Sequence, residues 1–255
     1  MRRALSAFAP ALFVALLLAA WEIAVRALRV PAYLLPAPSA VAGALADNAG
    51  LLAGSAWTTL SMALAALILA SLTALAIALA ISLSPLAERS VRPVAVALQV
   101  TPIVAIAPLV NIWAGLDHPE RAVIGLAAVV AFFPIFSGAV TGLKSADPDL
   151  ERLFDLYGAR RIQRLLRLRL PSAVPFLLEG HKVAAGLAVI GAVVAEFVSG
   201  SGGAKGLAWR LLEAANRLQT AKMFAALLIL GLMGVAAHAL FQALEDIVLK
   251  RWRGR

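Results

Sequence analysis

The chain has 255 residues, of which 62% are apolar and only 15% are charged, and its mean hydropathy is +0.90. Soluble globular domains carry about 45–50% apolar and about 25% charged residues, so this composition excludes an ordinary soluble protein and indicates a membrane protein. The formal net charge is +9, an excess expected in loops that face the anionic cytoplasmic leaflet rather than on a nucleic-acid-binding surface. The chain contains no cysteine, which excludes disulfides, thiolate metal sites and cysteine nucleophiles.

Six segments are long and apolar enough to cross a bilayer, which requires about 20 mostly apolar residues each. The clearest lies in the charge-free stretch between Asn48 and Ala87. The fifth segment is more polar than the others, yet its length and apolar content still favour a span. We therefore predict an all-α, polytopic membrane protein with a single transmembrane domain, residues 1–255, whose spans are about 8–28, 57–83, 93–116, 122–143, 174–198 and 223–249.

The first apolar segment follows Met1-Arg2-Arg3, which is a pattern shared by spans and by secretory signal peptides. Glu22 and Arg26 lie four residues apart near its end and can pair on one helix face. A cleaved signal does not need such a pair, so we expect a retained helix. Amino-terminal sequencing of the mature protein distinguishes the two alternatives.

The Lys and Arg residues of the loops predict the orientation of the chain. Basic residues precede the first span, lie between the second and third, follow the sixth, and are most numerous in residues 144–171. The opposite loops carry mixed charges, although the loop before the sixth span is also basic. Because cytoplasmic loops are enriched in Lys and Arg, we expect both termini to lie in the cytoplasm.

Residues 144–171 form the long hydrophilic stretch on the predicted cytoplasmic side, and their order predicts two short helices. Asp147 suits an N-cap, Pro148 suits the first helical position, and Gly158 suits the left-handed residue that ends a helix. The apolar residues between them recur at helical spacing. They form a stripe that consists of Leu150, Leu153, Phe154 and Tyr157.

A second, basic amphipathic helix is predicted before Pro171, which is expected to break it, and such helices are typical of membrane surfaces. We interpret its arginines as satisfying the positive-inside rule without specific contacts. The stripe of the first helix is different, because an apolar face on a loop gains nothing unless a partner covers it, as a groove on another protein does. The arginines are Arg160, Arg161, Arg164, Arg167 and Arg169.

The loop resembles the cytoplasmic signature of ABC importer permeases, in which a Glu-Ala-Ala segment is followed by a Gly-Ala and then a Leu-Pro. Gly158-Ala159 and Leu170-Pro171 match this signature in spacing. The Glu-Ala-Ala falls on residues 152–154, so its acidic residue is absent unless Glu151 replaces it. Other segments are similar to the branch that serves nitrate, sulfonate, taurine and pyrimidine-precursor uptake: Leu35-Pro36-Ala37-Pro38-Ser39, Pro102, Ala107-Pro108-Leu109, Trp113, Gly115, Phe133-Pro134 and Ala192-Val193-Val194-Ala195-Glu196.

The resemblance implies a type I ABC importer transmembrane fold in the bacterial cytoplasmic (inner) membrane, with a coupling helix between the fourth and fifth spans. It also implies a homodimer, two cytoplasmic ATP-binding subunits that hold ATP and magnesium, and an extracytoplasmic solute-binding protein. The chain itself is expected to bind no cofactor and to catalyse no reaction. The residues expected to dock on the ATP-binding subunit are Leu150, Glu151, Arg152, Leu153, Phe154, Asp155, Tyr157, Gly158, Ala159, Leu170 and Pro171.

Five residues are candidates for the translocation path. Pro102 and Pro108 are expected to interrupt the third span and to free carbonyl groups there, and Asn111 and Trp113 follow them. Trp113 equally suits an interfacial aromatic position. Glu196 either forms a structural or gating hydrogen bond or lines the path, and it is a poor ligand for an anion because like charges repel in a medium of low dielectric constant.

Three other patterns in the chain indicate structural rather than catalytic features. Glu179 and Lys182 lie three residues apart and are expected to pair. The glycines near Lys205 lack the order of a phosphate-binding loop, so an outer turn is expected at Gly200, Gly202, Gly203 and Gly206. The histidines show no metal-ligand spacing and no nucleophilic triad can be assembled; they are His118, His181 and His238.

We therefore predict a permease subunit that moves a small polar or anionic solute, such as a sulfonate or taurine, nitrate, or a pyrimidine or aromatic compound. One alternative is an ATP-independent secondary transporter or channel, which would need buried acidic residues or broken helices in paired repeats. Another is an intramembrane enzyme acting on lipid, which would need His, Asp or Glu at mid-depth. The two halves of the chain show no such repeat, and the second, third, fourth and sixth spans contain no Asp or Glu within their uncharged stretches.

Overall fold

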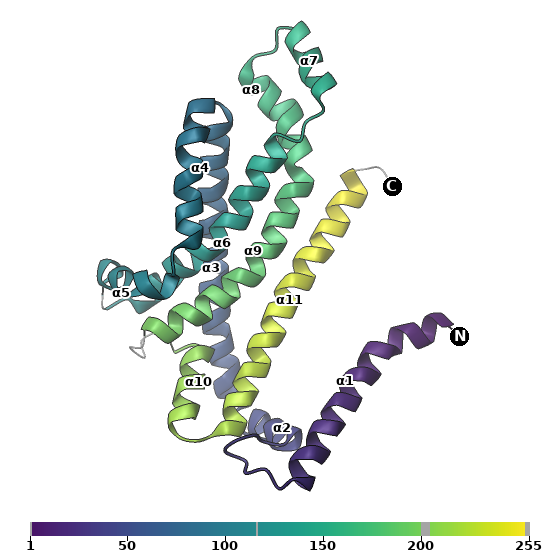
Figure 1. Ribbon diagram of the computed structural model, residues 1–255, viewed down its shortest axis with the longest axis vertical. Coiled ribbons are helices and arrows are strands. Elements are labelled where there is room, and N and C mark those ends of the chain that lie inside the picture. The colour runs from purple at the N-terminus through teal and green to yellow at the C-terminus, as the bar shows by residue number, and fades with distance from the viewer. Residues whose placement is uncertain (1, 116, 200–204, 253–255) are drawn as a thin grey trace. The chain divides into compact units, whose positions relative to one another are not determined.

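The computed structural model describes residues 2–115, 117–199 and 205–252, and in these ranges the chain forms helices and no strand. The predicted all-α class is confirmed. The helices are shown in Figure 1. The chain divides into two compact units, which we call the first unit (residues 1–57 and 205–230) and the second unit (residues 58–204 and 231–255).

The first unit contains α1 (Arg2–Ala27), α2 (Pro38–Asp47) and α10 (Leu207–Asn216). Glu22, near the end of α1, accepts hydrogen bonds from the Arg26 side chain at 2.6 Å and from the Ser39 hydroxyl and backbone N–H at 2.8 and 2.9 Å. The predicted Glu22–Arg26 pair is thus present. Because Ser39 belongs to the first turn of α2, the same carboxylate also fixes α2 against the end of α1.

Among the described residues, five helices are long and apolar enough to cross a membrane, and a bent pair of helices supplies a sixth span if it counts as one. The five overlap the predicted first, second, fourth, fifth and sixth spans. Several extend beyond the predicted bounds, and the fifth begins as early as Arg161. The long helices are α1, α3 (Ala49–Ser82), α6 (Pro119–Leu143), α9 (Leu170–Ser199) and α11 (Thr220–Trp252).

The segment predicted as the third span is broken into α4 (Pro85–Val100) and α5 (Ile103–Ala114), which are bent by 101° relative to each other. Thr101 is extended there, as expected for a residue before proline. Pro102 lacks the N–H that would donate to the carbonyl of Leu98. Pro108 was expected to interrupt the span as well, but it lies inside α5, so only Pro102 marks the break.

The helices α6 and α9 run side by side in the second unit (Figure 1) and pack through small residues. A Cβ atom on Gly138 would lie 2.6 Å from the carbonyl oxygen of Phe176, and one on Gly180 would lie 2.8 Å from that of Pro134. Glycine is therefore required at both positions, because any side chain would collide with the backbone of the partner helix. Small residues allow this close approach inside a membrane.

The segment before α9 differs from the prediction. The short helix α8 (Arg161–Arg164) continues into a π-helical turn, η1 (Leu165–Arg169), and α9 follows directly, so one continuous helical path runs from Arg161 to Ser199. Pro171 therefore does not break the run. Proline is tolerated in the first turn of a helix, and the π turn places the last donor before it, the N–H of Leu170, on the carbonyl of Leu165.

Candidate functional site

The loop between α6 and α9 carries a helix, α7 (Pro148–Leu156), whose start and end follow from its capping residues. The side chain of Asp147 accepts a hydrogen bond from the backbone N–H of Asp149 at 2.8 Å, and Pro148 occupies the first helical position. Gly158 has a φ of 61°, a conformation that glycine adopts without steric cost. The helix therefore lies where the sequence places it.

The apolar stripe of α7 is uncovered in the described part of the chain. Leu150 and Leu153 are 45% and 43% exposed, Tyr157 is 83% exposed, and Phe154 is half-buried. None of the residues of α7 is buried. An apolar face of this kind indicates an interaction surface.

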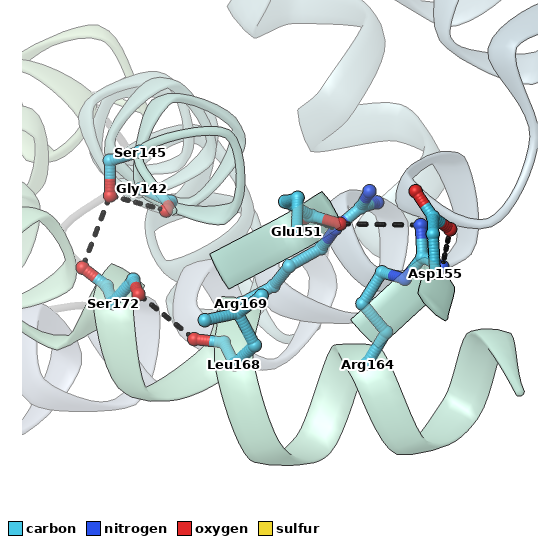
Figure 2. A network of polar contacts seen from close by, with 8 residues as sticks. All are labelled: Gly142, Ser145, Glu151, Asp155, Arg164, Leu168, Arg169 and Ser172. Atoms are coloured by element: carbon cyan, nitrogen blue, oxygen red, sulfur yellow. Dashed lines mark hydrogen bonds and ion pairs between the residues drawn. The ribbon is translucent and has the colours of Figure 1, made fainter. Parts of the chain in front are cut away.

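Two acidic residues of α7 tie this helix to the helical segment that follows it, as Figure 2 shows. Glu151 accepts a hydrogen bond from Arg169 Nε at 2.6 Å, and its second carboxylate oxygen lies 3.3 Å from Arg164 Nη1. Asp155 also pairs with Arg164. Because both arginines make specific contacts within the loop, the interpretation of them as mere topological charges is wrong.

The acidic residue that the signature carries is displaced by one position in this chain. Arg152, at the signature's acidic position, is 79% exposed and pairs with Asp149 at 3.0 Å on the outside of the loop. Glu151 instead faces Arg164 and Arg169. Glu151 thus links α7 to the helical segment that contains Arg164 and Arg169, whereas Arg152 pairs with a residue of α7 itself.

The base of the loop is joined by serine hydroxyls (Figure 2). Ser145 donates to the carbonyl oxygens of Gly142 at 2.8 Å and Ser172 at 3.2 Å, and Ser172 donates to that of Leu168 at 2.9 Å. The end of α6 is thereby linked to the start of α9. The remaining predicted docking residues, which are half-buried at the ends of the loop, are Ala159, Leu170 and Pro171.

Two of the predicted path residues, Glu196 and Asn111, form hydrogen bonds at the last turn of α9. Glu196 is 4% exposed and accepts a hydrogen bond from the Thr59 hydroxyl at 2.7 Å. Asn111 accepts one from the Ser199 hydroxyl at 3.0 Å, whereas Trp113 is 77% exposed. Glu196 and Asn111 therefore join helices of the second unit through hydrogen bonds.

The sequence analysis did not single out Gln99 and named Phe133 only for the family resemblance, yet both residues line two adjoining cavities of about 280 and 310 Å³ beside the α4–α5 break. The signal was present, because Gln99 is a polar residue in an otherwise apolar segment just before Pro102. Polar residues inside membrane spans are costly and mark functional positions.

A cluster of charges in the second unit was predicted only in part. Glu179 pairs with Lys182 as expected. Lys182 also lies 2.9 Å from Glu245 and 3.2 Å from the Gln242 amide oxygen, both on α11. These contacts link α9 to α11, and no local pattern predicts them because the residues lie far apart along the chain.

The predicted outer turn near Lys205 falls mostly on positions outside the described residues, namely Gly200, Gly202 and Gly203. Gly206 precedes α10, a helix that the sequence analysis did not predict. In α10, Arg210 donates to Ser55 at 3.0 Å and pairs with Glu213 at 2.7 Å. The hydrogen bond from Arg210, together with the nearby charges of Arg217 and Lys222, lowers the pKa of Glu213.

Comparison with known sequences decides the family. Residues 72–254 match the family described as binding-protein-dependent transport system inner membrane component. The chain belongs to this family. It is thus a multi-pass inner-membrane component and the permease subunit of an ABC importer, and the resemblance found in its loop and spans is confirmed.

Two similar proteins illustrate the relationship of this permease to others. The formylaminopyrimidine transport permease protein ThiX of Halalkalibacterium halodurans is 36% identical, and the match covers 99% of each chain. The riboflavin transport system permease protein RibX of Chloroflexus aurantiacus is 34% identical over 93% of this chain and 87% of the relative. Permeases named for aliphatic sulfonates, taurine and nitrate also match.

The fold of the permease also matches a solved structure. The crystal structure of an amino acid ABC transporter with histidines shares a TM-score of 0.65 and 14% identity, and the match covers 81% of this chain and 96% of that chain. At this identity the likeness shows the fold alone. It confirms the predicted type I transmembrane fold.

Proposed function

We propose that this permease converts ATP-driven closure of separate ATP-binding subunits into alternating access for a small solute, and that α7 is the helix on which those subunits dock. The observation that carries the proposal is the uncovered apolar stripe Leu150, Leu153, Phe154 and Tyr157 on a helix held by ion pairs. Apolar helix faces of this type bind in grooves of partner proteins.

The proposed force path runs from α7 into the membrane. A push on α7 reaches Arg164 and Arg169 through Glu151, and these arginines belong to the helical path that continues into α9. The close contact of α9 with α6 then moves the two helices as one body. In this scheme α7 and the segment before α9 move together as a rigid element, because the paired charges hold α7 in one orientation.

The proposed assembly contains a second copy of this chain, two cytoplasmic ATP-binding subunits that hold ATP and magnesium, and an extracytoplasmic solute-binding protein. The family description, which names binding-protein-dependent transport, supports the last partner. In this assembly the chain binds no cofactor itself. Both termini lie in the cytoplasm, in agreement with the excess of Lys and Arg in the loops that would share that side.

The proposed solute belongs to the set for which the relatives are named. These names include formylaminopyrimidine, riboflavin, aliphatic sulfonates, taurine and nitrate. We therefore propose a sulfonate or taurine, nitrate, or a pyrimidine or other aromatic compound as the solute of this permease.

The docking proposal is tested by purifying the permease from detergent-solubilised membranes and assaying the co-eluting protein for ATPase activity. Tyr157→Ser and Leu153→Ser remove apolar surface that is exposed in this chain, so we expect them to leave its folding intact. We expect each to reduce the retained ATPase at least tenfold, because burial of apolar side chains in a groove contributes about 1.5–3 kcal/mol each.

Asp149→Asn is the matched control on the same helix, because Asp149 is exposed and pairs with the exposed Arg152. We expect this variant to retain the ATPase at the level of the unchanged chain. Equal retention in all three variants would overturn the docking role of α7. Solute uptake into liposomes by the permease alone, without ATP, would instead favour the secondary transporter.

A further inference from the structure

We propose that the break between α4 and α5 is a binding site for an uncharged, planar heteroaromatic solute that carries both hydrogen-bond donors and acceptors. The inference rests on the proposed function and deepens it, because it selects one chemical class from the solutes of the relatives. Its three supports are the unpaired backbone at the break, the side chain of Gln99, and the lining of the two adjoining cavities.

The backbone at the break presents acceptors and donors at one point. No backbone N–H in the described chain donates to the carbonyls of Leu98, Gln99 and Val100, and residue 102 is a proline, which has no N–H for Leu98. The N–H groups of Ile103 and Val104, which begin α5, likewise donate to no backbone carbonyl there. Such groups at membrane depth require partners, and broken helices of this kind form solute sites in transporters.

Gln99 adds an amide, which is both a donor and an acceptor, to this surface. Within the described chain its side chain makes no hydrogen bond, and it is exposed. The neighbouring hydroxyls are already used, because Thr101 donates to the carbonyl of Ala97 at 2.7 Å and Thr73 to that of Leu69 at 2.8 Å. Gln99 is therefore the side chain available to recognise a polar ring edge.

The two cavities supply flat apolar surfaces beside these polar groups. Gln99 and Phe133 line both cavities, and Phe132, which stacks on Phe136 at a centroid distance of 5.4 Å, lines one. Their volumes of about 280 and 310 Å³ lie near the lower limit for small-molecule sites, which combine mostly apolar walls with few polar groups. A ring can stack on Phe133 while its edge meets Gln99 and the open backbone.

The absence of charged side chains from the described cavity linings favours uncharged over anionic solutes. None of the described residues that line the two cavities is charged. A sulfonate or nitrate ion would lose its hydration there and gain the two N–H groups at the start of α5 but no cationic side chain, while the unpaired carbonyls of Leu98, Gln99 and Val100 would repel it.

A lipid acyl chain would suit the apolar walls, but it would leave Gln99 and the backbone groups of the break without partners. Each such group costs several kcal/mol in hydrocarbon. A heteroaromatic ring satisfies the polar groups and the apolar walls together. For this reason the solute, rather than lipid, is the occupant that the geometry supports.

The first experiment uses the absence of cysteine from the chain. Thr101→Cys introduces a single thiol into the cavity lining and keeps Gln99, and Val96→Cys introduces one on the same helix outside both linings. The assembled transporter in membranes is treated with a water-soluble thiol reagent. We expect Thr101→Cys to react, and formylaminopyrimidine, but not taurine or nitrate, to slow its labelling at least fivefold.

The control Val96→Cys is expected to show no protection by any of the three compounds. Protection of Thr101→Cys by taurine or nitrate, or equal labelling with and without formylaminopyrimidine, would overturn the proposed solute class. A thiol at position 101 that the water-soluble reagent does not reach would point to lipid as the occupant and would overturn the site.

The second experiment measures uptake and ATPase activity of the same transporter carrying Gln99→Leu. We expect uptake of formylaminopyrimidine to fall about tenfold, which corresponds to about 1.4 kcal/mol, while assembly and solute-independent ATPase activity are unchanged. Unchanged uptake overturns the site but leaves the proposed function standing. Failure of the unmodified chain to assemble with an ATPase would overturn the proposed function itself.

Discussion

Two helix pairs of the second unit differ in how their helices meet. The helices α6 and α9 approach so closely that Gly138 and Gly180 leave no space for a side chain. The helices α4 and α5 are bent by 101° and have cavities beside the bend. Both pairs are built mainly from apolar residues, so hydrophobicity alone does not distinguish them.

The difference lies in where glycine and proline stand. Glycine in α6 and α9 faces the partner backbone, which brings the helices together and leaves few routes for relative movement. Pro102 stands between α4 and α5, where it removes a hydrogen-bond donor and leaves carbonyl groups open. Under the proposed function, the close pair transmits a force and the bent pair holds and releases a solute.

The largest effect is expected from a substitution that disrupts the close contact between α6 and α9. Gly138→Val places a side chain against the carbonyl of Phe176, and overpacking of this kind costs about 1–3 kcal/mol. We expect a lower midpoint of thermal unfolding in detergent and a reduced yield of folded protein. Gly186→Ala on α9 is the control, because a Cβ atom there meets no atom within 4 Å; its midpoint is expected to be unchanged or slightly higher, since alanine favours the helix more than glycine does.

A smaller effect is expected from weakening the ion pairs that hold α7 to the segment before α9. Glu151→Gln keeps the size of the side chain but removes its charge, which weakens the contacts with Arg164 and Arg169 by about 1 kcal/mol. We expect ATP hydrolysis to become partly uncoupled from uptake, measured as solute molecules moved per ATP. A ratio equal to that of the unchanged chain would show that the brace does not transmit the force.

A third substitution restores the backbone N–H donor that Pro102 lacks at the break between α4 and α5. Pro102→Ala supplies an N–H that can bond the carbonyl of Leu98 and so favours a straighter helix. We expect a gain in stability of at most about 1 kcal/mol, in line with the value of one hydrogen bond, together with slower solute uptake. Faster or equal uptake would contradict the role of the break.

The smallest effect concerns α10, which belongs to neither pair and serves as a reference. Because Arg210 lowers the pKa of Glu213 below its ordinary value of 4.5, the ionised carboxyl contributes stability above that pH, and the contribution is lost as the pH falls through the lower pKa of the folded state. We expect the difference in stability between the unchanged chain and Glu213→Gln to be below about 1 kcal/mol and to shrink below pH 4.5.

The sequence was sufficient where structure depends on neighbouring residues. Asp147, Pro148 and Gly158 define α7, since caps act within a few residues, and long apolar segments define the five continuous spans. Sequence patterns did not predict the contacts between segments that lie far apart along the chain. The pairing of Glu151 with Arg169, the contact of Lys182 with Glu245, and the cavities at Gln99 depend on how helices pack, which local pattern does not contain.

The helices α2 and α10 were missed for another reason. Each has 10 residues, which is too short to appear as a span, and both lie in segments that were interpreted as connecting loops. The position of the break in the third span was predicted at Pro102 but also at Pro108. Proline alone does not distinguish a helix end from a tolerated interior position, because neighbouring helices decide that outcome.

The π turn at Leu165–Arg169 amounts to one extra residue inserted into an α-helix. In a regular α-helix of 3.6 residues per turn, residues five apart point about 140° away from each other. A π turn joins residues five apart by its hydrogen bonds, so Arg164 and Arg169 come to the same side and both reach Glu151. A regular α-helix over the same residues would leave every charge in the chain and still separate the two arginines, which makes the π turn, as much as the charges themselves, a part of the proposed coupling.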